Sequence, residues 1–371
     1  MRVLMVTTSM SVGGVQTMVR DLATRLAQEG HDVGVVSLTG RDQVATPPSV
    51  RRWELGFDGL RGRDAWRCGR RLRRVIVDFH PDVVHAHAFH ANALAALAAL
   101  TALTAWRTPP RPAVVRTLHS VREGGALKAR ISGLTSPLAD LTVCVSAAVR
   151  DAHGVIDARV IHNGVDVDGH RFSDDARTAV RAEWGVSDDD VLVVSVGRMT
   201  PAKGYDTLLV ALSQVAPRGD LDLAGRRLVV AVVGDGEMRP ELESARVSRG
   251  FRHRVLMPGA RDDVPAVLSA ADAYVQSSHW EGFPVILLEA TAAGLPIIAT
   301  DAGGTRELDP GPALLVPAHD PGALARALSG VREMVQPLES RRAVLDLPAL
   351  SLERSATSWM AAYRSVTDVG S

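Results

Sequence analysis

Two carboxylates, Glu281 and Glu289, stand in the otherwise apolar stretch HWEGFPVILLEATAAGLPIIAT. A carboxylate accepts two hydrogen bonds side by side, which suits neighbouring hydroxyls such as those of a sugar or a ribose. The neighbours of Glu289 are almost all apolar, and an acid in such surroundings needs a partner because an unpaired buried charge is costly. The pattern favours two hydroxyl-binding carboxylates over one solvated Glu and one that only favours a helix start.

Pro284 predicts where the helix between these acids begins, because proline is well tolerated in the first helical turn. Glu281 would then precede the helix and Glu289 would lie on it. The backbone N–H groups after Phe283 would have no partner within the helix, so they could bind hydroxyl or phosphate oxygens.

Two cations, Arg198 and Lys203, occur in VGRMTPAKGYDTLL, after a predicted buried strand and before a predicted helix. A guanidinium fork and an ammonium in one loop suit a diphosphate. The alternative is two solvated loop cations, as most surface lysines and arginines are.

A Gly-Gly turn, Gly13–Gly14, opens the first predicted helix in SMSVGGVQT. Backbone N–H groups at a helix start can bind an anion, although the pair can equally be a simple turn. The dinucleotide fingerprint G-x-G-x-x-G is missing here, and VVGDGE also lacks its third glycine, which argues against an NAD enzyme.

Histidines are the remaining candidates for chemistry. His85 and His87 share one face of a predicted strand, but no carboxylate or cysteine stands nearby to complete a metal site, so we expect no bound metal. His119 ends the strand AVVRTLH and is the better single candidate for catalysis. The sequence DVD, Asp166 to Asp168, could suggest a divalent-metal motif, but it lies in a predicted junction and we discount it.

An arginine-rich stretch runs from Arg51 to Arg74 and holds nine arginines against three acids. It could contact anionic lipid or an anionic acceptor. A solvated helix face is the alternative, since long cationic side chains often cover a helix in water.

Bulk composition limits the class of protein. The 371 residues predict two domains, and Lys+Arg 42 against Asp+Glu 42 leaves no net charge, so the chain has no nucleic-acid signature. Two cysteines outside any C-x-x-C pair fit a reducing compartment. The apolar start is too short for a signal sequence, and ANALAALAALTALTAW falls short of a membrane span. We therefore expect a cytoplasmic protein.

Strand and helix signals alternate along both halves of the chain. Short apolar runs, typical of buried parallel strands, are separated by helical patterns, which predicts doubly wound α/β sheets. The polar, acidic, strand-free segment 165–190 would be the junction between two such domains. Ligands of open α/β sheets bind at the carboxyl ends of the strands, so we expect a ligand cleft between the domains. The expected strands are RVLMVTT, DVGVVSL, DVVHAHA, AVVRTLH, DLTVCVS, VLVVSVG, RLVVAVVG, RVLMPG, AYVQSS, PIIAT and ALLVP.

Several of these segments together resemble one family, the retaining glycosyltransferases of family 4 with the GT-B fold. The resemblance reaches from near the N-terminus to about residue 330, and the E-x7-E element combined with the Arg and Lys pair is its most specific part. It implies two Rossmann-like domains facing a central cleft, with the amphipathic C-terminal helix crossing back to the N-terminal domain. The matching segments are GGVQTMVRDLATRLAQEGHDV, PDVVHAH, VIHNGVDVD, VSVGRMTPAKGYDTLL, VVGDGE, EGFPVILLEATAAGLPIIAT and GGTRELD.

The resemblance also implies a division of the chain and roles for its residues. Residues 1–168 with about 352–371 would bind the acceptor, and 169–351 would bind the nucleotide-sugar donor. Glu281 would hold hydroxyls of the donor sugar, and Glu289 those of the ribose. The expected catalytic residues are Glu281, His119, Arg198 and Lys203. The expected donor-binding residues are Gly13, Gly14, Arg198, Lys203, Val233, Gly234, Arg261, Gly282, Phe283, Pro284, Val285, Ile286 and Glu289.

The implied activity is that of a hexosyltransferase. It would move a hexose or N-acetylhexosamine from a nucleotide-sugar, expected to be a UDP-sugar, to an acceptor hydroxyl, with retention and without metal or other cofactor. Alternatives are a nucleotide-sugar epimerase on the same fold and a non-catalytic nucleotide-sugar binding protein. The Ala- and Arg-rich composition suggests a bacterial source, where acceptors include envelope glycans, lipids and secondary metabolites such as aminoglycosides. Peripheral contact with the cytoplasmic face of a membrane remains an expectation, and the sequence predicts no oligomeric state.

Overall fold

The structure is a computed structural model, and it divides into two units. It describes residues 1–11, 13–40, 43–58, 62–102, 111–122, 125–215, 222–223, 226–251, 254–309, 313–342 and 347–368. Unit 1 comprises Met1–Gly164 and Ser351–Ser371, and unit 2 comprises Val165–Leu350. The sequence placed these divisions at 168/169 and 351/352.

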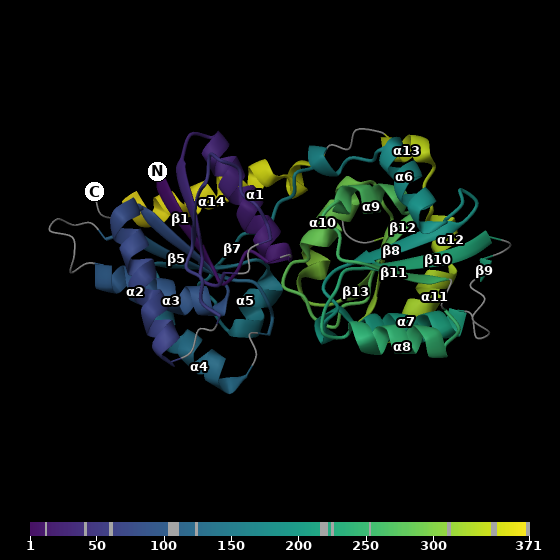
Figure 1. Ribbon diagram of the computed structural model, residues 1–371, viewed down its shortest axis with the longest axis horizontal. Helices are drawn as coiled ribbons and strands as arrows, with labels where there is room; N and C mark the ends of the chain where they lie inside the picture. Colours follow the sequence, from purple (N-terminus) through teal and green to yellow (C-terminus); the bar gives the residue numbers. More distant parts are fainter. Residues whose placement is uncertain are drawn as a thin grey trace. The chain divides into compact units, whose positions relative to one another are not determined.

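Unit 1 is built on a sheet of seven parallel strands with helices on both faces (Figure 1). In spatial order the strands are β3 (Arg51–Glu54), β2 (Asp32–Ser37), β1 (Arg2–Thr7), β4 (Val83–His87), β5 (Ala113–Leu118), β6 (Leu141–Cys144) and β7 (Arg159–Val160). The helices are α1 (Gly14–Gln28), α2 (Gly62–Phe79), α3 (Phe89–Ala102), α4 (Ala126–Thr135), α5 (Ala147–His153) and α14 (Leu352–Thr367), with a short 3-10 turn η1 (Ser136–Leu138).

Alternate residues of these strands supply two hydrophobic cores, as the strand period of two requires. Val3 and Met5 of β1 face a core shared with α1 and α14. Leu4 and Val6 face a core shared with α2 and α3. The strands are therefore apolar on both faces, which is why each reads as a continuous apolar run in the sequence.

The C-terminal helix α14 belongs to unit 1, as predicted. Trp359 and Tyr363 are almost fully buried in the core that also contains α1. Ser355 Oγ donates to the main-chain oxygen of His162, which ties the start of α14 to the strand region just before the chain leaves unit 1.

Unit 2 has the same design, with six parallel strands between layers of helices (Figure 1). In order they are β11 (Val255–Gly259), β10 (Arg226–Val233), β8 (Val191–Val196), β12 (Ala273–Gln276), β13 (Ile297–Asp301) and β14 (Leu314–Pro317), and β9 (Asp222–Leu223) pairs antiparallel with β10. The helices are α6 (Asp174–Trp184), α7 (Tyr205–Val215), α8 (Arg239–Ser248), α9 (Val264–Ala270), α10 (Val285–Ala292), α11 (Pro321–Ser329), α12 (Val331–Met334) and α13 (Leu338–Arg342). The 3-10 turns are η2 (Asp168–His170), η3 (Pro201–Lys203), η4 (Gly304–Glu307) and η5 (Pro348–Leu350).

The predicted doubly wound fold and all eleven expected strands are confirmed. The sequence missed the strands β3, β7 and β9. β3 has the sequence RRWE and lies at the edge of its sheet, where it pairs only with β2. Edge strands often carry polar residues, so β3 lacks the apolar run that identifies the other strands. β7 and β9 are only two residues long.

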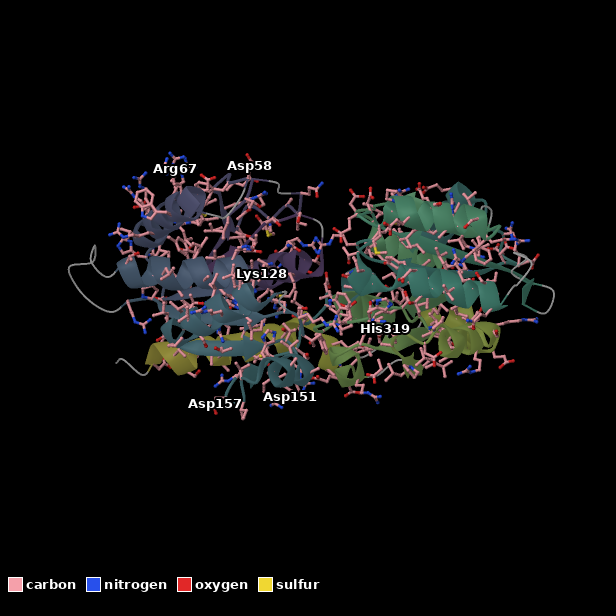
Figure 2. The ribbon with its side chains drawn as sticks, turned by 90° about the horizontal axis from the view of Figure 1, so that it is seen from below. Asp58, Arg67, Lys128, Asp151, Asp157 and His319 are labelled. Atoms are coloured by element: carbon pink, nitrogen blue, oxygen red, sulfur yellow. The ribbon has the colours of Figure 1, made fainter. Side chains whose placement is uncertain are left out.

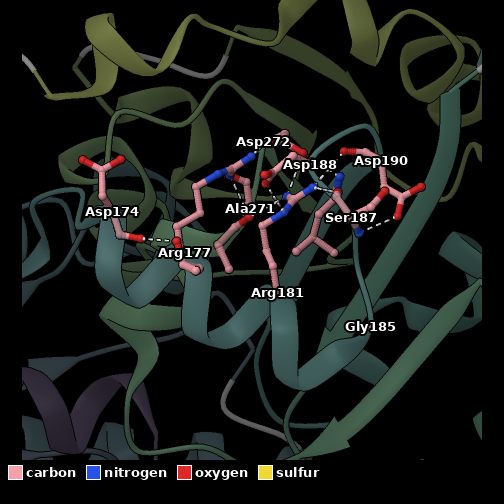
Figure 3. A network of polar contacts seen from close by, with 12 residues as sticks. Asp174, Arg177, Arg181, Gly185, Ser187, Asp188, Asp190, Ala271 and Asp272 are labelled. Carbon is pink, nitrogen blue, oxygen red and sulfur yellow. Dashed lines mark hydrogen bonds and ion pairs between the residues drawn. The ribbon is translucent and has the colours of Figure 1, made fainter.

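The boundary between the units lies at the start of segment 165–190, which contains no strand, but the segment also contains the helix α6, which the sequence did not predict and which packs on α9. Arg177 and Arg181 of α6 point inward, and both are buried (Figure 3). They bind the two carboxylate oxygens of buried Asp272 at 2.8 and 3.2 Å. The same Asp272 accepts the N–H of Leu192 at 2.7 Å, so this network fastens α6 to the start of β8.

Arg341 of α13 joins this buried network from another side. Its guanidinium donates to main-chain oxygens of Leu268, Ala271 and Ala293, at the ends of α9 and α10. Burial lowers the pKa of Arg341 to about 10, because the cation loses hydration. The carbonyl oxygens replace water and satisfy the guanidinium inside the fold.

Candidate functional site

The loop after β8 lies so close to the loop after β10 that only glycine fits. Gly234 has φ +141°, and a Cβ there would stand 2.0 Å from the main-chain oxygen of Gly197. Arg198 follows Gly197 and is exposed. Its guanidinium makes no hydrogen bond or ion pair with any residue that the structure describes. Arg198 is therefore available for an anionic ligand at the carboxyl end of β8.

The loop carrying Lys203 is docked on the loop that follows β12. Gly204 has φ +59°, and a Cβ there would stand 2.1 Å from the main-chain oxygen of Ser277. Ser277 Oγ donates to the main-chain oxygen of Lys203 at 2.9 Å, and the His279 N–H donates to that of Ala202 at 2.7 Å. These contacts fix the backbone of Lys203 beside the loop that contains Glu281.

Lys203 and Glu281 bind each other. Lys203 Nζ lies 2.6 Å from Glu281 Oε1, and Ser278 Oγ donates to the same oxygen at 2.7 Å. Both charged side chains are mostly buried, with 24% and 12% of their surface exposed. The other oxygen, Oε2, has no hydrogen bond to a described residue, and an ammonium has three donors. The pair thus keeps one acceptor and further donors for a ligand.

The segment from Gly282 to Ile286 forms the start of α10. The sequence placed Pro284 in the first turn, but Pro284 is the extended N-cap residue and α10 begins at Val285. Proline suits this position because its fixed φ matches the backbone found there. Gly282, Phe283 and Val285 are buried, so side chains do not reach solvent between Glu281 and the helix. The loop is held from its other side by bridge pairing between Glu281 and Gly303.

Glu289 lies on α10 and is 8% exposed, so the predicted need for a partner is real. His170 of η2 lies beside this carboxylate, with Nε2 3.8 Å from Glu289 Oε1. The sequence missed His170, because nothing local to DVDGH indicates a contact with a helix that comes more than a hundred residues later.

Three other expected donor-binding residues, Val233, Gly234 and Arg261, differ in their burial and in their hydrogen-bond partners. Val233 is buried in β10, and Gly234 donates its N–H to the Gly259 main-chain oxygen, which aligns the ends of β10 and β11. The Arg261 guanidinium is engaged by Asp263 at 2.7 Å and Glu183 at 2.6 Å. Contact between Arg261 and a base stays a prediction, and it would have to involve atoms outside these ion pairs.

Gly13, Gly14 and His119 belong to unit 1, whereas all other predicted site residues belong to unit 2. Gly13 is the N-cap residue of α1, and α1 begins at Gly14. The first turn of α1 contains no acidic residue, so its N–H groups face no competing carboxylate from that turn.

His119 is linked to the histidines of β4. His119 Nε2 and His87 Nδ1 share a hydrogen bond of 3.1 Å, and the ring of His85 lies 3.9 Å from that of His87. His85 bridges Tyr363 Oη and Thr117 Oγ1, both at 2.7 Å. Burial lowers the pKa of His119 to about 4, so its ring is neutral near pH 7.

Neither a membrane span nor a metal site emerges from the described residues. In that part of the chain, no helix combines the length and apolar character needed to cross a bilayer. The described His, Cys, Asp and Glu side chains include no group of three placed to hold a metal ion.

Two family models match the chain, one in each half. Residues 12–168 match the model described as Glycosyltransferase Family 4. Residues 190–333 match the model described as Glycosyl transferases group 1.

Curated proteins similar to this chain include a glycosyltransferase and a glycogen synthase. A D-inositol 3-phosphate glycosyltransferase of Geodermatophilus obscurus is 30% identical, over 96% of this chain and 85% of that protein. A glycogen synthase of Mycobacterium tuberculosis is 29% identical, over 96% of this chain and 88% of that protein.

Solved structures share the fold. HepE of Anabaena, in complex with UDP and glucose, gives a TM-score of 0.79 at 20% identity, over 98% of this chain and 100% of that one. Sucrose-phosphate synthase of Thermosynechococcus elongatus also gives 0.79 at 20% identity, over 99% of each chain. The two doubly wound units, the matched models and the relatives agree: the chain belongs to glycosyltransferase family 4 and has the GT-B fold.

Proposed function

We propose that this glycosyltransferase moves a hexose or N-acetylhexosamine from a UDP-sugar to an acceptor hydroxyl, with retention at the anomeric carbon. The observation that carries the proposal is the Lys203–Glu281–Ser278 cluster before α10. In this cluster an ammonium, which suits a diphosphate, lies beside a carboxylate, which suits sugar hydroxyls, and this supports the proposal.

The leaving group would be stabilised mainly by cations. When the bond between the anomeric carbon and the phosphate oxygen breaks, its electron pair stays on the diphosphate, and the sugar becomes oxocarbenium-like. Arg198 and Lys203, with the N–H groups at the start of α10, would stabilise this negative charge, and we propose that no metal ion is needed.

Retention would follow from attack on the same face as departure. The acceptor oxygen bonds to the anomeric carbon while its proton passes to the leaving phosphate oxygen, so charge and atoms balance. His119 would face the donor sugar as a neutral ring, in accord with its lowered pKa. Gly13 and Gly14 would let the backbone of unit 1 approach the donor phosphate.

The nucleotide would be recognised in unit 2. Glu289 would accept hydrogen bonds from the ribose hydroxyls, and the segment of Val233, Gly234 and Arg261 would line the base. Uracil is proposed because HepE, which shares the fold, was solved with UDP, with UDP and glucose, and with UDP-glucose.

The acceptor would be an envelope glycan, a lipid or a secondary metabolite of a bacterial cytoplasm.

The exposed face of α2 favours peripheral membrane contact. Trp66 is 63% exposed, and the Arg70 guanidinium lies 4.8 Å from the centroid of the Trp66 ring. Figure 2 shows Arg67 of the same helix at the surface of unit 1. Of the arginine-rich stretch, residues 59–61 lie outside the described residues. Pelleting with phosphatidylglycerol vesicles but not phosphatidylcholine vesicles would support this contact, and equal pelleting would contradict it.

A donor screen tests the central proposal. Calorimetric titration with UDP-, GDP- and dTDP-sugars should show binding of a UDP-sugar, and binding of GDP-sugars alone would contradict the donor assignment. Incubation with the bound donor and no acceptor should leave its sugar configuration unchanged, whereas conversion to another sugar would indicate an epimerase. Donor binding with no transfer to any acceptor of the three classes would indicate a binding protein.

A further inference from the structure

His170 occupies a defined place beside Glu289. Its Nε2 lies 3.8 Å from Glu289 Oε1, and the two side chains are 11% and 10% exposed. The gap is too long for a direct hydrogen bond, so the ring limits the positions of the carboxylate by filling the space next to it.

The ring is held in this orientation by its own loop. His170 Nδ1 lies 2.9 Å from the main-chain oxygen of Asp166. Because a carbonyl oxygen only accepts, Nδ1 carries the proton and Nε2 is the atom turned to Glu289. The Asp166 carboxylate accepts the N–H of Gly169 at 3.2 Å. Asp166 therefore holds the turn that carries His170 through two hydrogen bonds, one at its main-chain oxygen and one at its side chain.

A second contact fastens this loop to the same helix. The guanidinium of Arg341 lies 4.5 Å from the ring centroid of Phe172, two residues after His170. Arg341 also donates to the main-chain oxygen of Ala293, directly after α10. One buried cation therefore anchors both the segment that carries His170 and the helix that carries Glu289.

We propose that His170 is a positioning residue that orients the Glu289 carboxylate for the ribose hydroxyls of the nucleotide. The proposal rests on the ribose-binding role proposed for Glu289. A glutamate has several rotatable bonds, and holding it in one rotamer reduces the conformational entropy that ligand binding would otherwise remove. His170 would thereby set how strongly the site prefers a ribonucleotide to a 2′-deoxyribonucleotide.

The test measures that preference by calorimetry on the full chain. UDP is compared with dUDP, GDP with dGDP and ADP with dADP, and the pair that the wild type binds best is used for the variants. H170N retains an amide that can donate to the Asp166 oxygen but does not reach Glu289. H170Q extends its amide to the place of Nε2. R171A is the matched control, because Arg171 is 47% exposed and pairs only with Asp168 among the residues that the structure describes.

The wild type should bind the ribonucleotide about tenfold more tightly, as expected for a hydrogen bond to a charged group. H170N and H170A should reduce this preference to about threefold or less, while H170Q and R171A should keep it. The preference is a ratio within each variant, so a general loss of stability cancels.

Two results would overturn the proposal in distinguishable ways. If the wild type shows the preference and H170N weakens both nucleotides equally, His170 is only structural and the role of Glu289 stands. If the wild type shows no preference, or binds none of the nucleotides, the role of Glu289 fails and the proposal for His170 fails with it.

Discussion

Lys203 and Glu281 make one charged unit, and their effects on catalysis should be coupled. K203A and E281Q should each lower kcat/KM about 10²- to 10³-fold, because each removes one charge and leaves the other misplaced. The double variant should lose little more than the worse single variant, since residues that act together are not additive. Steady-state kinetics of donor consumption would measure this.

The control for this cycle is D151N, which removes an exposed ion pair on α5, where Asp151 Oδ1 lies 3.0 Å from Arg150 Nη2. It should leave kcat/KM within about twofold, because exposed pairs contribute little. Fully additive losses at Lys203 and Glu281 would show that the two residues act separately.

The neutral histidines of unit 1 predict loss of stability in mild acid. Burial lowers the pKa of His119 to about 4 and holds the pKa values of His85 and His87 well below the usual range. Between about pH 6.5 and 4 the unfolded chain binds protons that folded unit 1 does not, so stability falls as pH falls through this window. The low pKa of His119 alone should reduce the free energy of unfolding by about 2 kcal/mol between pH 7 and pH 5.

Hydrogen exchange at pH 7 and pH 5, corrected for intrinsic rates, would check this unit by unit. Amides of β4 and β5 should lose more protection than those of β8 and β10. The ion pair of Asp190 with Arg227 holds the pKa of that carboxyl at about 2, so in unit 2 its contribution is lost only at lower pH. Equal loss in both units would contradict the assignment to the histidines.

Residue types and their place after strands were enough to predict Lys203, Glu281 and Glu289 as candidates. Their partners, Ser278 and His170, could not be predicted in the same way. Ser278 acts through a geometry that only the docked loops create. His170 meets Glu289 because two segments far apart in sequence pack together, and a single sequence carries no signal for that contact.

At the scale of elements, the docking of η3 on the loop after β12 depends on Gly204. G204A should lower the unfolding temperature and weaken donor binding about tenfold or more, because its Cβ would collide with the Ser277 oxygen and displace Lys203. G185A is the matched control, since Gly185 has a similar φ of +64° with nothing within 4 Å of a Cβ.

For G185A we expect a cost of only about 1 kcal/mol and unchanged donor affinity. Calorimetric unfolding and donor titration on both variants would distinguish two effects. G185A shows the cost of a positive φ alone, and G204A adds the steric clash with the Ser277 oxygen. If the two glycine variants behave alike, the close contact between the loops is not what places Lys203.

The elements that could be predicted are those whose residues are buried by apolar packing. Parallel strands covered on both faces show continuous apolar runs, so their existence follows from the sequence. α6 was missed because its buried face carries Arg177 and Arg181, and charged residues normally indicate a solvated surface. Their acid, Asp272, is supplied by the segment between α9 and β12, which no local pattern in α6 reveals.

At the scale of the whole molecule, unit 1 depends on a helix from the other end of the chain. A chain ending at Leu350 should fail to fold unit 1, because Trp359, Met360 and Tyr363 fill its core and losing even one large core side chain costs about 3–5 kcal/mol. Unit 2 should remain folded, since all its strands lie between Val165 and Leu350.

Hydrogen exchange would again report on each unit. A chain ending at Thr367 is the control and should retain the protection of β4 and β5. Retained protection in the chain that ends at Leu350 would show that α14 is not required for the fold of unit 1.

This arrangement reverses the order in which the two units can mature during translation. Residues 1–164 leave the ribosome first, yet their sheet lacks the cover of α14 until unit 2 has been made. At about 5–20 residues per second, this delay is on the order of ten seconds or more. During that time the face of β1 that carries Val3 and Met5 has α1 but not α14 to cover it, so part of its apolar surface is left open to other nascent chains. The half that is synthesised first is therefore the half that most needs a chaperone.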